Sequence, residues 1–293
     1  MSEERSTALD AQAACLWEAH ARKLGNVHPG ASFDDMALLD FSLSAAAIGP
    51  SFSCVGASWC SPGSAILDAI QKTRLVTERN TNLGIVLLCM PLAFAQIRGS
   101  FRGVWRVVRD IDPSDTGLVY HAIRLANPGG LGDAPEQDVH SEPTVTLLEA
   151  MKLAADRDLI ARQYANGYAD VFDLGMPAFL AGLEKHGCVE AAVIECQLAW
   201  MAAFPDSLIA RKRGLAVAED VQRRVLHVLS LGGLDTAAGR RAGVELDAHL
   251  RSDGNKLNPG TTADLVAACL FVALRENKVK PSAPFRWNVP DWL

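Results

Sequence analysis

The chain has no apolar run long enough to cross a membrane. The apolar stretch at residues 83–97 is interrupted by Pro91 and Gln96, and it is shorter than the about 20 consecutive apolar residues that a membrane-spanning helix needs. The first ten residues are charged and polar, without the apolar segment of an export signal. We therefore expect a cytoplasmic protein without a membrane partner, in which residues 83–97 form a central buried helix.

An excess of positive charge is also missing. The net charge of −6 argues against a nucleic-acid partner, so any anionic ligand must be held by local donors. The seven cysteines include no CxxC pair and no histidine spacing typical of zinc. Most of them lie in apolar runs, which predicts buried free thiols rather than a redox or metal centre.

Alternating patterns typical of β-strands are nearly absent. Residues 103–111 come closest, and they fit a helix equally well. No repeat or low-complexity linker divides the chain. Helical periodicity predicts one all-α domain of roughly ten or more helices, with a stop at Gly49–Pro50. The expected helices span residues 8–24, 34–49, 63–78, 83–98, 115–126, 144–165, 177–186, 188–204, 214–231, 234–251 and 261–276.

Four connections are richer in glycine, asparagine and charge than turns require. Long structured loops in a compact helical domain are more often functional than idle. We expect them to form one site within the single domain 1–293. They span residues 23–35, 78–84, 127–144 and 255–265.

The polar knot before the apolar stretch reads Arg79-Asn80-Thr81-Asn82. Thr81 or Asn82 can cap a helix that begins near Leu83. The free N–H groups and the positive end of the helix dipole at such a start bind phosphate. Ordinary capping and a phosphate site are the two interpretations, and the adjacent charges favour the site.

Two other loops allow the same pair of interpretations. Gly129, Gly130 and Gly132 either expose successive N–H groups to an anion or end a helix and form a turn. The chain lacks the lysine and serine or threonine of a P-loop. Thr261 or Thr262 either caps the last apolar helix or contacts an anion or a sugar.

Carboxylates beside these loops are suited to magnesium, which prefers one or two carboxylates together with phosphate oxygens. Asp35, Asp138 and Asp264 lie at three separate breaks, and a helical bundle can bring such breaks together at one end. These three are the predicted Mg²⁺ ligands. Asp158 and Arg162 stand four residues apart and predict an ion pair on a helix.

The ordered motifs resemble those of the triphosphoribosyl-dephospho-CoA synthases. The likeness extends from about Glu18 to Leu274. It is carried by Glu18 with KLGNVHP (23–29), DFSLSA (40–45), ERNTNLG (78–84), GGLG with Asp138 (129–138), LLEAMKLAADRDLIARQYANGY (147–168), DSLIARKRG (206–214) and LNPGTTADLVAA (257–268).

The resemblance implies an all-α enzyme that joins the triphosphoribosyl part of ATP to a hydroxyl of 3′-dephospho-CoA and releases adenine. Breaking the ribose–N9 bond gives an oxocarbenium-like transition state that a nearby carboxylate stabilises. A base takes the proton of the hydroxyl, and an acid protonates the departing adenine. ATP is then a substrate, and Mg²⁺ would assist its triphosphate.

The motifs together with the loop chemistry assign the candidate site residues. The catalytic candidates are Glu18, Asp35, Glu78 and Asp138. His28 is expected to act as a local hydrogen-bonding group rather than as the base. The substrate-binding candidates are Lys23, Asn26, His28, Asn80, Thr81, Asn82, Gly84, Gly129, Gly130, Gly132, Arg162, Asp206, Arg211, Asn258 and Thr261.

The chain also departs from the family pattern. Residues 80–84 read Asn-Thr-Asn-Leu-Gly where the typical motif reads Asn-Thr-His-Lys-Gly, and residues 23–29 lack its Lys-Pro-Gly. Two alternatives follow: a member that acts on another alcohol, such as the ribitol of a methanopterin-type C1 cofactor, or a nucleotide-binding protein without catalysis.

Overall fold

The computed structural model describes residues 6–130 and 136–281, and within them the chain is all-α. Its only extended pairings there are two isolated bridges, His28 with Ala31 and Phe33 with Met36. The α-helices are α1 (Thr7–His20), α2 (Leu38–Ser53), α3 (Pro62–Val76), α4 (Leu83–Ile97), α5 (Val104–Arg109), α6 (Pro113–Ala126), α7 (Leu147–Ala154), α8 (Leu159–Asn166), α9 (Met176–His186), α10 (Val189–Ala203), α11 (Ser207–Arg213), α12 (Leu215–Ser230), α13 (Ala237–Arg251) and α14 (Gly260–Arg275).

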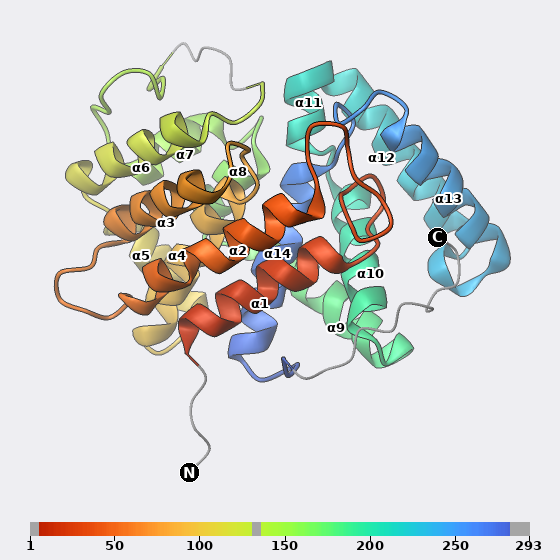
Figure 1. Cartoon of the computed structure of the whole chain (residues 1–293), viewed down its shortest axis with the longest axis horizontal. Helices are drawn as coiled ribbons and strands as arrows, with labels where there is room; N and C mark the ends of the chain where they lie inside the picture. Colours follow the sequence, from red (N-terminus) through yellow and green to blue (C-terminus); the bar gives the residue numbers. More distant parts are fainter. Residues whose placement is uncertain (1–5, 131–135, 282–293) are drawn as a thin grey trace.

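Helices α4 and α14 form the centre of the molecule. Nearly every residue of both is buried, and they pack against each other. Figure 1 shows α1 and α2 side by side across one face, with α14 behind them and with α12 and α13 at one edge. A second apolar cluster joins α10, α12 and α13. The predicted all-α class and the central position of residues 83–97 are confirmed.

Two helices contain an internal proline, and a side chain from another helix satisfies each carbonyl that the proline leaves free. Pro91 cannot donate to the carbonyl of Leu87, which instead accepts the Tyr164 hydroxyl at 2.7 Å. Pro50 likewise frees the carbonyl of Ala46, which accepts the side-chain amide of Gln12 at 2.9 Å. The predicted stop at Gly49–Pro50 is therefore wrong: α2 continues to Ser53.

The helix expected over residues 144–165 is two helices. α7 begins at a Thr146 cap, and α8 begins at Asp158, whose carboxylate accepts the N–H groups of Ile160 and Ala161. Two capping signals within one apolar pattern thus divide it. Other boundaries also differ, because α1 ends at His20 and a short α11 follows residue 206. Residues 104–109 are helical.

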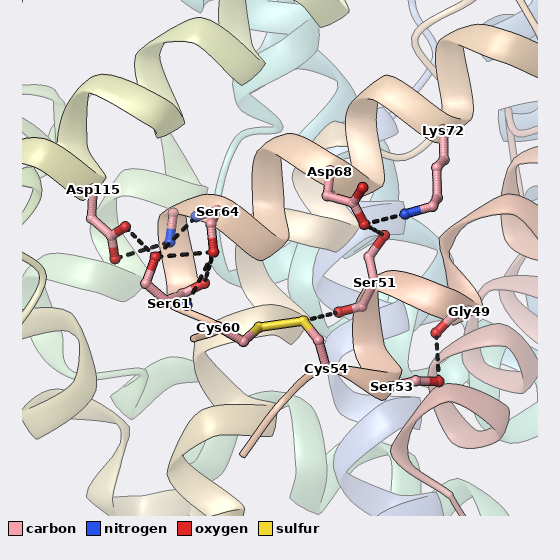
Figure 2. The surroundings of a disulfide bond; sticks show 11 residues. Gly49, Ser51, Ser53, Cys54, Cys60, Ser61, Ser64, Asp68, Lys72 and Asp115 are labelled. Atoms are coloured by element: carbon pink, nitrogen blue, oxygen red, sulfur yellow. Dashed lines mark hydrogen bonds and ion pairs between the residues drawn. A yellow bond between two sulfur atoms is a disulfide. The ribbon is translucent and has the colours of Figure 1, made fainter. Parts of the chain in front are cut away.

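One pair of cysteines is bonded rather than free. Figure 2 shows the disulfide between Cys54 and Cys60, which closes the turn between α2 and α3. The two Cα atoms lie 5.9 Å apart, within the usual range for such a bond. The other five cysteines are free and buried, as expected. The expectation of free thiols was wrong for this pair because a turn, not a motif spacing, brings them together.

Among the described residues, no single helix is long and apolar enough to cross a membrane. α4 and residues Phe101–Arg109 pass that test only as a pair, and the chain bends by 109° between them. Leu83 to Ala95 are buried within the protein.

The prolines give a first prediction about stability. Replacing Tyr164 by Phe leaves the buried carbonyl of Leu87 without its closest donor, which costs about 1–3 kcal/mol of unfolding free energy. Gln12→Ala removes the equivalent donor from Ala46, which is exposed so that water replaces it. We expect the second loss to be at most about 0.5 kcal/mol. Urea unfolding measures both, and equal losses would contradict this account.

Candidate active site

A cavity of about 380 Å³ lies where α4 and α14 begin. The first residues of both helices line it, so two helix N-termini point toward one space. Gly84 and Asp264 face each other across the two helices. A Cβ atom on Gly84 would lie 2.0 Å from Oδ2 of Asp264. Only glycine at position 84 therefore allows the Asp264 carboxyl group to reach the cavity.

The start of α4 is held by side chains of the polar knot. Asn80 accepts the N–H of Leu83 through its Oδ1 at 3.2 Å. The Thr81 hydroxyl donates to Ser44, and the Asn82 amide donates to Thr73. The capping role predicted for Thr81 or Asn82 thus belongs to Asn80, because the other two side chains bond to α2 and α3. In the described chain, no acceptor is seen for the N–H groups of Gly84 and Ile85.

Two acidic side chains in this cavity have different environments. Glu18 is buried and forms an ion pair with the fully buried Lys23, at 2.7 Å between Oε1 and Nζ. Asp264 is partly buried and has no hydrogen-bond or ion-pair partner among the described residues. Burial raises the pKa of Asp264 well above the ordinary value, and the nearby Glu18 carboxylate raises it further. The two side chains therefore differ in electrostatic environment: Glu18 is held in an ion pair, whereas Asp264 has no partner among the described residues and a raised pKa.

Four cationic side chains line the same cavity: Arg74, Arg79, Arg211 and Lys212. Arg211 pairs with Asp158, yet its Nε is buried and has no hydrogen-bond partner in the described structure. Burial lowers the pKa of Lys212, and Arg211 acts in the same direction. These cations gather in a chain whose net charge is −6, so they provide the local donors that an anionic ligand needs.

Asparagines are concentrated in this cavity. Six of the nine in the chain line it, and their amides are suited to hydroxyl groups and heterocycles. Asn26 donates to Asn258 at 2.5 Å and accepts from the Gln197 amide at 3.0 Å. This network ties the loop after α1 to the loop before α14. The six are Asn26, Asn80, Asn82, Asn127, Asn255 and Asn258.

A second cavity of about 320 Å³ adjoins the first. Side chains of α4, α6, α7 and α8 form it, and most of them are apolar. The two cavities share six lining residues, so they meet at one common boundary. The shared residues are Asn80, Leu83, Gly84, Pro128, Arg211 and Asp264.

Most of the predicted site residues come together in the first cavity. They derive from all four predicted loops and from α1, α4, α11 and α14. Those that line it are Glu18, Asn26, Asp35, Glu78, Asn80, Thr81, Asn82, Gly84, Gly129, Arg211, Asn258, Thr261 and Asp264.

Other predicted residues lie outside it. Lys23 forms the ion pair with Glu18 but does not line the cavity. Gly130 packs against the backbone of Arg211. Asp138 lines only the second cavity. Gly132 lies outside the described residues. The three predicted magnesium ligands therefore do not share one cavity, and in the described chain the single group with metal-like spacing is His186, Glu195 and Asp235 elsewhere.

Two predicted site residues have other partners in the structure. Arg162 pairs with Asp170 at 2.7 Å and not with Asp158, because the Asp158 carboxylate caps α8 and pairs with Arg211. Asp206 accepts four hydrogen bonds from the starts of α11 and α14, including the N–H of Thr262. It therefore caps α14 in place of the threonines.

His28 does not line either cavity. Its Nδ1 accepts the N–H of Gly30 at 3.1 Å, and burial, followed by Arg251 and Lys23, lowers its pKa to about 4. The imidazole is neutral at pH 7, as expected for a local hydrogen-bonding group.

Five polar residues that line the first cavity are absent from the predicted set: Arg74, Arg79, Asn127, Lys212 and Asn255. Lys212 follows the predicted Arg211, and Arg79, Asn127 and Asn255 lie within predicted loops, so the sequence contained evidence for these four. Arg74 lies in the last turn of α3 and gave none, since its position depends on how α3 packs.

Comparisons with known proteins identify the family of this chain. The family model for ATP:dephospho-CoA triphosphoribosyl transferase matches residues 4–282. The chain belongs to this family. A crystal structure of an Archaeoglobus fulgidus protein assigned as a triphosphoribosyl-dephospho-CoA synthase is 29% identical, with a TM-score of 0.62, over 80% of this chain and 97% of that one.

Curated relatives match over a shorter stretch. A Pseudomonas savastanoi pv. phaseolicola protein assigned as 2-(5″-triphosphoribosyl)-3′-dephosphocoenzyme-A synthase is 34% identical over 113 residues, which are 38% of each chain. The Klebsiella pneumoniae enzyme of that name is 29% identical over 113 residues, which are 38% of this chain and 40% of the relative. These alignments span less than half the length of the relatives.

The contact between Gly84 and Asp264 gives a prediction with an internal control. Gly84→Ala should cost about 1–3 kcal/mol of unfolding free energy because the added methyl group meets the carboxyl group. Gly117→Ala, in α6, has nothing within 4 Å of its added Cβ and should gain up to about 1 kcal/mol from helix propensity.

Removing the Asp264 carboxyl group should remove much of the destabilisation caused by Gly84→Ala. In an Asp264→Ala background, we expect the cost of Gly84→Ala to fall by about 0.5–3 kcal/mol. Urea unfolding of the four variants measures the coupling. An unchanged cost in that background would show that Asp264 is not the group that excludes a side chain at position 84.

Proposed function

We propose that this protein transfers the triphosphoribosyl group of ATP to a hydroxyl of 3′-dephospho-CoA and releases adenine. Membership of the family supports the reaction type. The observation that carries the proposal is the first cavity, where two helix N-termini and four cations surround the Glu18 and Asp264 carboxyl groups. The triphosphate requires the positive donors, and the reacting sugar requires carboxyl groups next to them.

The triphosphate is best accommodated at the start of α4. The free N–H groups of Gly84 and Ile85, the α4 dipole and the unpartnered Nε of Arg211 all favour negative charge. Arg79 and Lys212 extend the positive surface. Bonds between Asn80, Thr81 and Asn82 and their neighbours hold the site rigid before a ligand arrives.

Glu18 is the residue best placed to act on the acceptor. Its carboxylate faces the cavity, and the ion pair with Lys23 fixes its position. A fixed carboxylate stabilises an oxocarbenium-like sugar and accepts the proton of the attacking hydroxyl.

Magnesium fits the exposed part of the first cavity better than the part that contains Glu18 and Asp264. Asp35 and Glu78 are exposed carboxylates that line it, and together with phosphate oxygens they would hold the ion. The ion would neutralise charge on the triphosphate. In this proposal the sugar-facing Glu18 and Asp264 remain free for chemistry.

Incubation with ATP, Mg²⁺ and dephospho-CoA should yield free adenine and an acceptor heavier by one triphosphoribosyl group, both measured by chromatography and mass spectrometry. Formation of ADP or AMP without adenine would overturn the proposal. The substitution of Asn82 and Leu83 for the family's His-Lys makes a second acceptor class worth including. Adenine release only with a ribitol-containing alcohol would reassign the acceptor, and ATP binding without adenine release would indicate a non-catalytic protein.

Substitution of Arg79 tests the phosphate site without disturbing the fold. Its side chain is exposed and has no partner in the described structure. Loss of one charge-assisted contact costs about 1.5–3 kcal/mol, so Arg79→Ala should raise the KM for ATP about ten- to a hundredfold. Arg241→Ala, an exposed arginine outside both cavities, is the matched control. Equal ATP kinetics in both variants would remove Arg79 from the site.

The magnesium assignment is tested by ATP affinity. We expect calorimetry to show tighter ATP binding in Mg²⁺ than in EDTA, and Asp35→Asn to reduce the difference because a carboxylate ligand is lost. The same affinity in Mg²⁺ and in EDTA would contradict a metal-bridged triphosphate.

A further inference from the structure

The second cavity differs from the first in its chemistry. Leu87, Ile123, Leu147, Met151 and Ile160 supply an apolar lining. Such a space, closed by a few polar groups, is typical of a site for a flat organic ring.

The charged side chains of the second cavity disfavour a phosphate. Glu136, Asp138 and Asp158 line it, and they are opposed by Arg157 and by Arg211, which already pairs with Asp158. The lining thus contains more acids than free cations. A neutral heterocycle fits this balance, whereas the diphosphate of a coenzyme A precursor does not.

The residues shared by the two cavities indicate where the sugar can lie. The bond that breaks joins C1′ of the ribose to N9 of the base, so the base lies next to the reacting carbon. If the triphosphate occupies the start of α4, the ribose lies beside the shared residues Gly84, Arg211 and Asp264. The base then extends past these residues into the adjoining apolar cavity.

We propose that the second cavity receives the adenine base of ATP and that Asp264 is the acid that protonates the base as it leaves. This inference rests on the proposed triphosphoribosyl transfer. Asp264 is suited to the role because it lines both cavities and has no partner among the described residues.

The bond between C1′ and N9 breaks, and its electron pair goes to the purine ring. The Asp264 carboxyl group gives its proton to a ring nitrogen and becomes a carboxylate. The acceptor oxygen bonds to C1′, and its proton passes to the Glu18 carboxylate. Proton exchange with water then restores both side chains. Burial, followed by the nearby Glu18, raises the pKa of Asp264 and so favours the protonated form that this step needs.

The first test uses the unmodified chain with methyl-labelled methionine. Met151 lines the second cavity, and Met36 lines the first. Free adenine should shift the Met151 methyl resonance, through the ring current of the purine, and leave that of Met36 unchanged. Inorganic tripolyphosphate should leave Met151 unchanged. A shift of Met36 alone on adding adenine would overturn the assignment.

The second test fills the cavity. Ala150→Phe and Met151→Trp should weaken adenine binding and raise the KM for ATP, each by about tenfold or more, with unchanged tripolyphosphate affinity as proof of folding. Leu153→Phe, on the exposed side of α7, is the control. A rise in the KM for dephospho-CoA alone would place the acceptor there and overturn the proposal.

The acid is tested by Asp264→Asn, which keeps the shape of the side chain. It should lower kcat about 10²–10⁴-fold, the usual contribution of a general acid, while adenine and tripolyphosphate still bind. A kcat within a few-fold of the unmodified protein would overturn the role of Asp264. These outcomes are distinct from failure of the proposed function, in which the unmodified chain releases no adenine with any acceptor.

Discussion

The packing of Gly84 against Asp264 is the contact on which the arrangement of the site depends. Because no side chain fits at position 84, the first turns of α4 and α14 approach closely enough to share one wall. Their N-termini then open into the same cavity, and α1 adds Glu18 while α11 adds Arg211. The two central, mostly buried helices thus form a rigid support beneath the polar residues of the cavity.

The electrostatics of the site result from burial rather than from net charge. A chain of charge −6 gathers four cations around one cavity, and among the described residues the Nε of Arg211 has no partner. Two carboxyl groups in this cavity differ in their surroundings: Glu18 forms an ion pair with Lys23, while Asp264 has no such partner within the described chain and burial raises its pKa. Two similar side chains are therefore held in different electrostatic environments.

Local patterns predicted much of this structure. The period of the apolar residues indicated α4 and α14, and the polar segment 79–82 correctly indicated a helix start near Leu83. The sequence motifs also carried the family likeness that the comparisons confirm.

The sequence-based predictions failed where residues distant in the sequence determine the local structure. Asp206 caps α14 from another helix, and Gln12 compensates for the proline in α2. The Cys54–Cys60 bond depends on a turn between two packed helices. The second cavity could not be foreseen, since α6, α7 and α8 meet there only in the folded chain, with α4 as its inner side.

The most direct test of the account is a crystal structure of the protein with Mg²⁺ and a non-reactive ATP analogue. The account predicts phosphate oxygens within hydrogen-bond distance of the Gly84 and Ile85 N–H groups and of Nε of Arg211, with the ribose against Asp264. Phosphates bound away from the start of α4, for example on the exposed arginines of α12, would contradict the central claim.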